Sequence, residues 1–203
     1  MTRSWWRENR FWLPALPVAL AGLLLASSFN VKEYWYDNGL HHELASAGTG
    51  TFVSATDHYD DPLGPTSRTY SVRLAWLGST EAYPDEEYGD PGPLPEGTDA
   101  VVVHLDWKAQ ADQVLRGCHV SLVDDQGRRY DVTRQFVNPC TPEGRAGPSD
   151  PFTATGERGI VPPGEDRPAT WSTAPVILVP HGRQVTHVLV WWQTPGYVQL
   201  SAS

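Results

Sequence analysis

A run of 19 residues without a charge, residues 11–29, most constrains how this chain of 203 residues can fold. As a helix rising 1.5 Å per residue, the run would measure about 28 Å, close to the hydrocarbon thickness of a bilayer. Arg3, Arg7 and Arg10 precede it, so the positive-inside rule places residues 1–10 in the cytoplasm and the rest of the chain outside. We therefore expect a transmembrane helix over 11–29 that acts as a signal anchor in a single-pass protein of the cell membrane.

Aromatic residues flank this run on both sides, within residues 5–12 and at residues 34–36. Trp and Tyr side chains favour the headgroup level of a bilayer, which agrees with a helix that stays in place. A cleaved signal peptide is the alternative, because residues 26–28 are small and offer a cleavage point. In both cases the C-terminal part of the chain is exported.

Cys118 and Cys140 are the two cysteines of the chain. An even number of cysteines in an exported segment predicts a disulfide. By closing a loop of about 23 residues, the bridge would stabilise the fold by roughly 3 kcal/mol. Two free buried thiols and a metal site are the alternatives, although cysteines this far apart lack the C-x-x-C spacing of a zinc site.

Beyond residue 50 the apolar residues alternate with polar ones, which is typical of half-buried strands. Gly (18) and Pro (18) are abundant and disfavour long helices. The expected strands are 51–55, 69–76, 100–107, 119–123, 128–132, 176–179 with 169–171 leading into it, 185–192 and 197–200. They predict an all-β fold, an antiparallel β-sandwich of seven to eight strands preceded by one N-terminal transmembrane helix.

The chain thus divides into a cytoplasmic N-terminus (1–10), the transmembrane helix (11–29), a polar juxtamembrane stalk (30–49) and an extracytoplasmic domain (50–203).

Two long insertions, 78–99 and 138–167, interrupt the strand pattern. Loops longer than about 15 residues are uncommon and are often functional. The acidic residues of the first insertion are therefore candidate binding residues: Asp85, Glu86, Glu87 and Asp90.

Trp191 and Trp192 are adjacent at the end of an expected strand, so they point to opposite faces of the sheet. We expect one of them in the core and the other exposed or covered by a loop. An exposed indole would be suited to contact a partner or a carbohydrate, so both are candidate binding residues.

Three stretches carry a resemblance to a known family. Residues 122–130 read LVDDQGRRY, residues 161–165 read VPPGE before a strand, and residues 101–107 form a β-branched strand. These stretches and the closing strand resemble the immunoglobulin-like (telokin-like) extracytoplasmic domains of Gram-positive bacterial membrane-anchored proteins and lipoproteins. The resemblance covers roughly residues 50–200 and implies an Ig-like sandwich that serves as a binding or interaction module without a catalytic site. The chain departs from this pattern in lacking a cysteine for lipid attachment.

The sequence contains no Gly-x-Ser-x-Gly, His-Glu-x-x-His or phosphate-loop motif. A net charge of −9 argues against a nucleic-acid partner. His104, His119 and His187 would suit zinc or copper if they converged on one sheet face, but ordinary strand histidines are the simpler interpretation. We expect neither a metal nor a cofactor.

We therefore expect an extracytoplasmic module that binds a protein or envelope partner, with residues 11–29 in contact with lipid. Two alternatives stay open. One is a metal-dependent envelope hydrolase that uses the scattered histidines. The other is an accessory subunit of a transport or secretion complex, in which the membrane helix is the interface.

Overall fold

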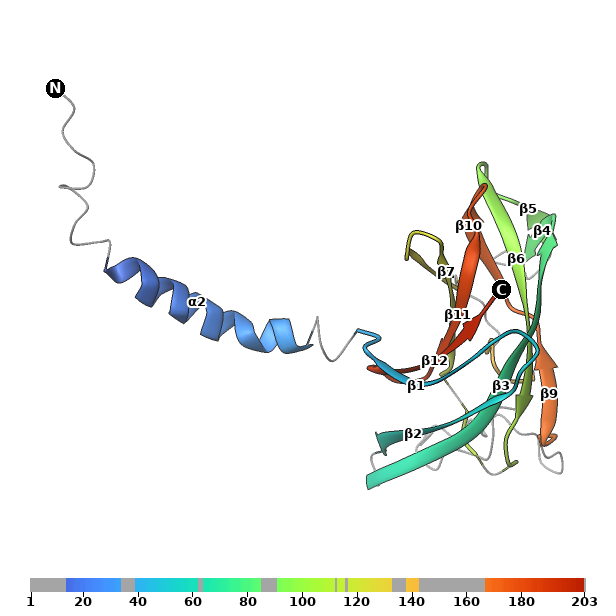
Figure 1. Cartoon of the computed structure of the whole chain (residues 1–203), viewed down its shortest axis with the longest axis horizontal. Helices are drawn as coiled ribbons and strands as arrows, with labels where there is room; N and C mark the ends of the chain where they lie inside the picture. Colours follow the sequence, from blue (N-terminus) through green and yellow to red (C-terminus); the bar gives the residue numbers. More distant parts are fainter. Residues whose placement is uncertain are drawn as a thin grey trace.

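The computed structural model describes residues 14–33, 39–61, 64–84, 91–111, 113–115, 117–132, 138–142 and 167–202. Within them, helix α2 (Ala15–Val31) precedes a β-sandwich (Figure 1). The strands are β1 (His42–Ala47), β2 (Val53–Asp61), β3 (Gly64–Thr80), β4 (Ala82–Pro84), β5 (Pro91–Pro93), β6 (Thr98–Lys108), β7 (His119–Asp124), β8 (Arg129–Asp131), β9 (Thr170–Thr173), β10 (Val176–Pro180), β11 (Val185–Trp191) and β12 (Gly196–Ser201).

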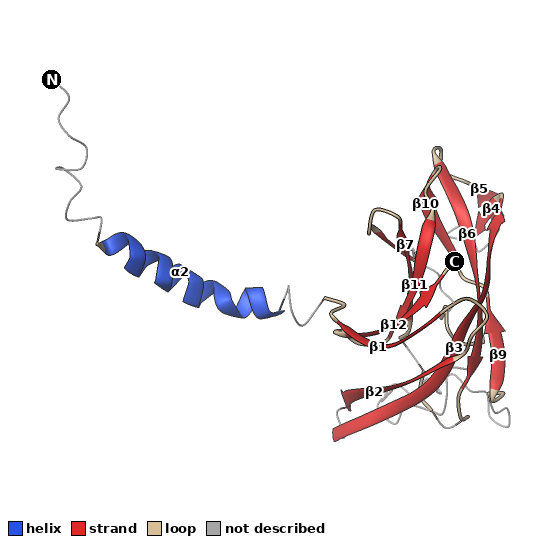
Figure 2. Cartoon of the chain, in the orientation of Figure 1, coloured by secondary structure: helices blue, strands red, loops and turns tan. Residues whose placement is uncertain are grey.

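Helix α2 lies clear of the strands in Figure 2 and carries apolar side chains all around its surface. Its large residues, such as Leu16, Val18 and Leu25, are 52–76% exposed. The helix has 17 residues and begins later than the expected segment 11–29, of which residues 11–13 lie outside the described part. Among the described residues, no helix combines the length and the apolar character that crossing a membrane requires.

Two sheets form the sandwich, as the alternating pattern predicts. Sheet A has the strand order β1-β12-β11-β7-β8, and sheet B has the order β10-β6-β3-β2. Strand β9 pairs with the second half of β6, beside β10, which pairs with the first half. The pairs are antiparallel except for β1 and β12, which run parallel, and β4 and β5 form a separate small hairpin.

Two segment predictions need correction. The expected stalk, residues 30–49, contains β1, which pairs with the last strand of the chain. The first insertion, residues 78–99, contains the end of β3, the β4–β5 hairpin and the start of β6. Both corrections have one physical reason: these short strands are stabilised by partners that the local sequence pattern cannot reveal.

The core between the sheets is rich in aromatic side chains. Tyr70 of β3 lies 4.3 Å from Trp192, and Trp107 of β6 stacks on Trp171 of β9 at 6.3 Å, measured between ring centroids. The indole N–H groups of the three tryptophans each donate a hydrogen bond, at 2.8–3.1 Å. Each ring therefore buries its apolar surface without leaving its polar atom unsatisfied.

The predicted disulfide is confirmed: Cys118 and Cys140 are joined, with their Cα atoms 6.0 Å apart. Cys118 immediately precedes β7, and Cys140 follows β8 in the chain. The expected strands 119–123 and 128–132 are found as β7 and β8, which pair as an antiparallel hairpin. Its turn contains Gly127 at φ +74°, and the Asp124 carboxylate accepts the backbone N–H groups of Gln126 and Arg128.

Candidate functional site

Trp76, on the outer face of sheet B, is the large apolar side chain that the described part of the sandwich exposes, at 53%. Strict alternation along β3 would place Trp76 in the core with Tyr70, Val72 and Leu74. A β-bulge shifts the register between Leu74 and Trp76. An extra residue in one strand reverses the face of the side chains that follow, so Trp76 points outward.

His104 supports the indole from the neighbouring strand. It is the cross-strand partner of Trp76, and the two rings stack with their centroids 3.4 Å apart and their planes at 15°. Burial lowers the pKa of His104, and the nearby charge of Asp106 opposes this shift. Because burial is the larger cause, the imidazole is neutral at neutral pH. One face of the indole thus stacks on a neutral ring, while 53% of the residue remains exposed.

Gly78 gives the indole its space on β3. A Cβ atom built on Gly78 would collide with ring atom Cζ3 of Trp76. The indole therefore occupies the space that a side chain at position 78 would need.

A row of polar side chains crosses three strands next to this pair. Arg73 of β3, Asp106 of β6 and Ser172 of β9 are cross-strand neighbours. The Asp106 carboxylate accepts one hydrogen bond from Arg73 Nε at 2.8 Å and another from the Ser172 hydroxyl at 2.6 Å. The hydrogen bonds from Ser172 and Arg73 lower the pKa of Asp106. Asp106 is therefore suited to orient hydrogen-bond donors rather than to take up a proton.

Phe52 extends this surface on the other side of Arg73. The Arg73 guanidinium lies 4.7 Å from the Phe52 ring centroid, and the Lys108 ammonium lies 3.9 Å from it. We call the whole surface the Trp76 face; its members are Phe52, Arg73, Trp76, His104, Asp106, Lys108 and Ser172. It combines aromatic rings with fixed donors and acceptors on a rigid sheet, an arrangement suited to binding.

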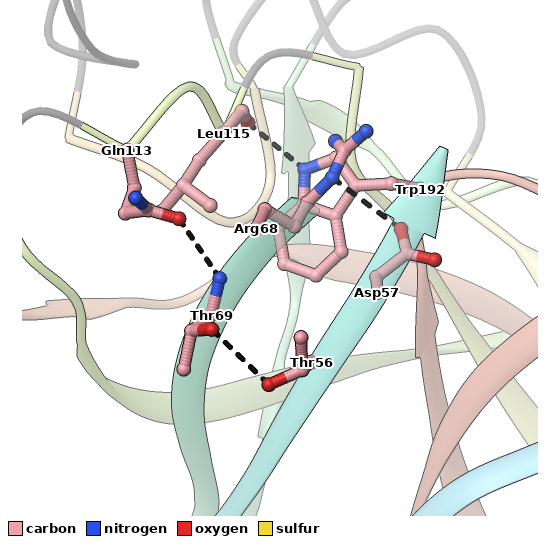
Figure 3. A network of polar contacts seen from close by, with 7 residues as sticks. All are labelled: Thr56, Asp57, Arg68, Thr69, Gln113, Leu115 and Trp192. Atoms are coloured by element: carbon pink, nitrogen blue, oxygen red, sulfur yellow. Dashed lines mark hydrogen bonds and ion pairs between the residues drawn. The ribbon is translucent and has the colours of Figure 1, made fainter. Parts of the chain in front are cut away.

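A second polar cluster lies on β2 and on the part of β3 that extends beyond β6, and Figure 3 shows it from close by. Asp57 and Arg68 form an ion pair at 3.3 Å and are 6% and 4% exposed. The Arg68 guanidinium lies 3.8 Å from the Tyr59 ring centroid and 5.6 Å from that of Trp192. Burial raises the pKa of Asp57 and lowers that of Arg68, against their mutual attraction. This pair is held inside the fold and is not available to a partner.

Hydrogen bonds around the pair close this end of the sandwich. The backbone N–H of Thr69 donates to Gln113 Oε1 at 2.8 Å, and Trp192 Nε1 donates to the Leu115 carbonyl at 3.1 Å (Figure 3). A cleft of about 590 Å³ lies beside Thr69, along the strand edge that β6 leaves open. Its lining mixes polar and apolar groups and includes Lys108, Gln110 and Thr170.

No protein-family model matches the chain, and no curated protein matches its sequence. A solved structure of an uncharacterized beta-sandwich protein from Clostridium difficile 630 is similar, with 10% identity and a TM-score of 0.36. The similarity covers 81% of this chain and 96% of that one. At this identity and score it assigns neither a family nor a function.

The two tryptophans predicted as binding residues are both buried, Trp191 at 8% and Trp192 at 5% exposure. They do lie on opposite sides of sheet A. Trp192 belongs to the core cluster, whereas Trp191 stacks on His119, with Arg129 5.4 Å from its ring centroid. Neither is the exposed indole that we expected as a binding residue. Trp76 has an exposed indole. The sequence did not predict its exposure, because the bulge between Leu74 and Trp76 cannot be recognised from the local pattern of residues.

The acidic candidates Asp85, Glu86, Glu87 and Asp90 lie outside the described residues. The three histidines considered as metal ligands do not converge: His104 lies in sheet B, and His119 and His187 lie in sheet A. In the part of the chain that the structure describes, no group of three or more His, Cys, Asp and Glu residues is placed to hold a metal ion.

Proposed function

We propose that this protein is a single-pass, membrane-anchored extracytoplasmic module that binds a component of the cell envelope through the Trp76 face. The observation that carries the binding part is the exposure of Trp76 next to a preformed Arg73–Asp106–Ser172 row. Exposed tryptophan and arginine side chains are the residue types that contribute most to binding energy in interfaces.

The anchor rests on the apolar N-terminal segment. Residues 11–29 carry no charge, and the large side chains of α2 face solvent in every direction. A helix that is apolar all around requires an apolar surrounding, which a bilayer supplies. The arginines before the segment favour a cytoplasmic N-terminus.

The strand order supports an immunoglobulin-like topology for the exported domain. In sheet A, β12, β11, β7 and β8 follow one another as the G, F, C and C′ strands do in variable-type immunoglobulin domains. The disulfide departs from that scheme. It joins the residue before β7 to a residue after β8, whereas the bridge of antibody domains links strands B and F of the two sheets.

Photo-crosslinking in intact cells tests the binding part. A photo-reactive amino acid at Val102, which precedes His104 by two residues on the same face of β6, should form an adduct with an envelope component. Trp76→Ala in the same chain should abolish the adduct, whereas Gln126→Ala, in the exposed β7–β8 turn, should leave it unchanged. An adduct that survives Trp76→Ala contradicts the proposed face.

The same experiment distinguishes the accessory-subunit alternative. Replacing residues 11–29 by an unrelated spanning helix should leave the Val102 adduct intact if the Trp76 face is the binding surface. Loss of the adduct after this replacement, with Trp76→Ala silent, would instead place the interface in the membrane segment.

Protease protection tests the location. Protease added outside intact cells should remove an epitope at the C-terminus, and alkaline carbonate should leave the chain in the membrane pellet. Extraction by carbonate would contradict the anchor, and protection of the epitope would contradict the orientation.

A further inference from the structure

We infer that the Trp76 face binds extended glycan chains whose pyranose rings are joined by β-1,4 linkages; this inference rests on the proposed function. The indole of Trp76 is held in place and still accessible. The ring of His104 stacks on one face of the indole, with the centroids 3.4 Å apart, and Gly78 leaves space for the six-membered part of the ring. Trp76 nevertheless remains 53% exposed. An open, flat and rigidly held aromatic face matches the apolar C–H face of a pyranose ring, because C–H groups point toward the electron-rich face of the π-system.

The polar row supplies the second half of the recognition. Asp106 follows His104 by two residues on the same face of β6, so the row lies about 6.7 Å from the aromatic pair along the strand. Sugar hydroxyls need both donors and acceptors beside the ring they surround. Arg73 and Ser172 are already oriented by Asp106, at 2.8 and 2.6 Å, so they lose little further freedom when a hydroxyl group binds.

The shape of the surface selects the kind of glycan. The Trp76 face lies on strands and is not a deep pocket, and its members follow one another along β6 at positions 104, 106 and 108. Chains of β-1,4-linked pyranoses are flat, extended ribbons that can lie along such a row, whereas α-1,4-linked chains coil. Phe52, with Lys108 over its ring, would contact the chain at the far end of the row.

Other occupants fit the surface less well. A protein partner buries an apolar centre within roughly 1,200–2,000 Å², and Trp76 is the one large apolar side chain that the described sandwich exposes. A lipid tail needs a concave apolar pocket. A nucleic acid needs a basic surface, and the chain has a net charge of −9.

The test is isothermal titration calorimetry of the full chain in a detergent without a sugar headgroup. The probes are chitohexaose and cellohexaose, both β-1,4-linked, and maltohexaose, which is α-1,4-linked. At least one β-linked hexamer should bind, and maltohexaose should bind more weakly. Trp76→Ala should weaken binding by tenfold or more, on the scale of a binding hot spot.

Gly78→Ala is the sharper variant, because it keeps every side chain of the face but displaces the indole. It should weaken binding of the β-linked hexamer about three- to tenfold. Gln126→Ala is the matched control and should bind as the unaltered chain does. Circular dichroism and thermal unfolding of each variant confirm that the fold is retained, as expected for an exposed side chain.

Two outcomes would overturn the inference: no binding of either β-linked hexamer, or equal binding by the Trp76→Ala variant. If the Val102 adduct still depends on Trp76 in that case, the binding module stands and only the glycan is wrong. If the adduct also fails to depend on Trp76, the proposed function falls with the inference.

Discussion

Two cross-strand pairs of a tryptophan and a histidine lie on the outer faces of the two sheets, and they differ in how much of the indole solvent reaches. On sheet A, Trp191 pairs with His119, with ring centroids 5.2 Å apart and planes at 16°, and it is 8% exposed. On sheet B, Trp76 pairs with His104 in a similar stack and is 53% exposed. The same two residue types in the same pairing therefore serve packing on one sheet and present a surface on the other.

The surroundings of the two pairs explain the difference. The Arg129 guanidinium lies over the ring of Trp191. Trp191 and Cys118 of the disulfide also line one small cavity. Around Trp76 the neighbour at position 78 is a glycine, and the charged groups of the next row pair with one another. Trp191 is therefore covered because neighbouring side chains pack on it, whereas Trp76 stays exposed because its charged neighbours pair with one another.

Truncation of the two indoles should separate these roles by the largest margin. Trp191→Ala should lower the free energy of unfolding by about 3–5 kcal/mol, because it removes a large buried side chain. Trp76→Ala should change it by less than about 1 kcal/mol. Urea unfolding of the two variants checks this, and similar losses from both would show that the pairs do not differ in role.

Removal of the disulfide, which lies beside the Trp191–His119 pair of sheet A, should lower the stability of the fold and leave binding at the Trp76 face unchanged. The double variant Cys118→Ala and Cys140→Ala should lose about 3 kcal/mol of unfolding free energy, since the bridge restricts the unfolded chain. Hexamer binding below the unfolding temperature should stay within about twofold of that of the unaltered chain, a difference of about 0.4 kcal/mol. A large loss of binding in the folded double variant would show that the two faces are coupled.

The row beside Trp76 should contribute a smaller, pH-dependent term. The folded pKa of Asp106 is lowered, so the stability it contributes is present above the unfolded pKa of about 3.9 and is lost as the pH falls through the folded value. Asp106→Asn should cost less than about 1 kcal/mol at pH 7, because the pair is partly solvated. The difference from the unaltered chain should shrink below about pH 4. A difference that stays constant between pH 7 and pH 3 would exclude this role for the charge.

The smallest expected effect is the titration of the histidine under Trp76. Burial lowers the pKa of His104, so its imidazole C–H resonances should titrate below the ordinary value of about 6.5. Two-dimensional NMR of the unaltered chain measures this directly. In the Trp76→Ala variant the imidazole is more solvated, so its pKa should move back up. A pKa that does not respond would show that the indole does not desolvate His104.

Much of the sandwich could be predicted from local pattern, because a strand that packs on one face records its partner layer in every second residue. Residues 100–107 and 119–132 show this: β6, β7 and β8 lie where the alternation of apolar and polar residues places them. The short strands β1, β4 and β5 escaped prediction. Their pairing depends on distant or brief contacts that a window of sequence does not contain.

For the candidate site, too, the sequence determined some features and the tertiary structure decided the others. The sequence by itself determined that an uncharged N-terminal run precedes an acidic, strand-rich region, and that two cysteines were available to form one bridge, since these follow from composition and spacing. Which tryptophan faces solvent was decided only by tertiary structure. One bulge between Leu74 and Trp76 reverses the alternation, and Arg129 folds over Trp191, so the exposed indole is the one that periodicity assigns to the core.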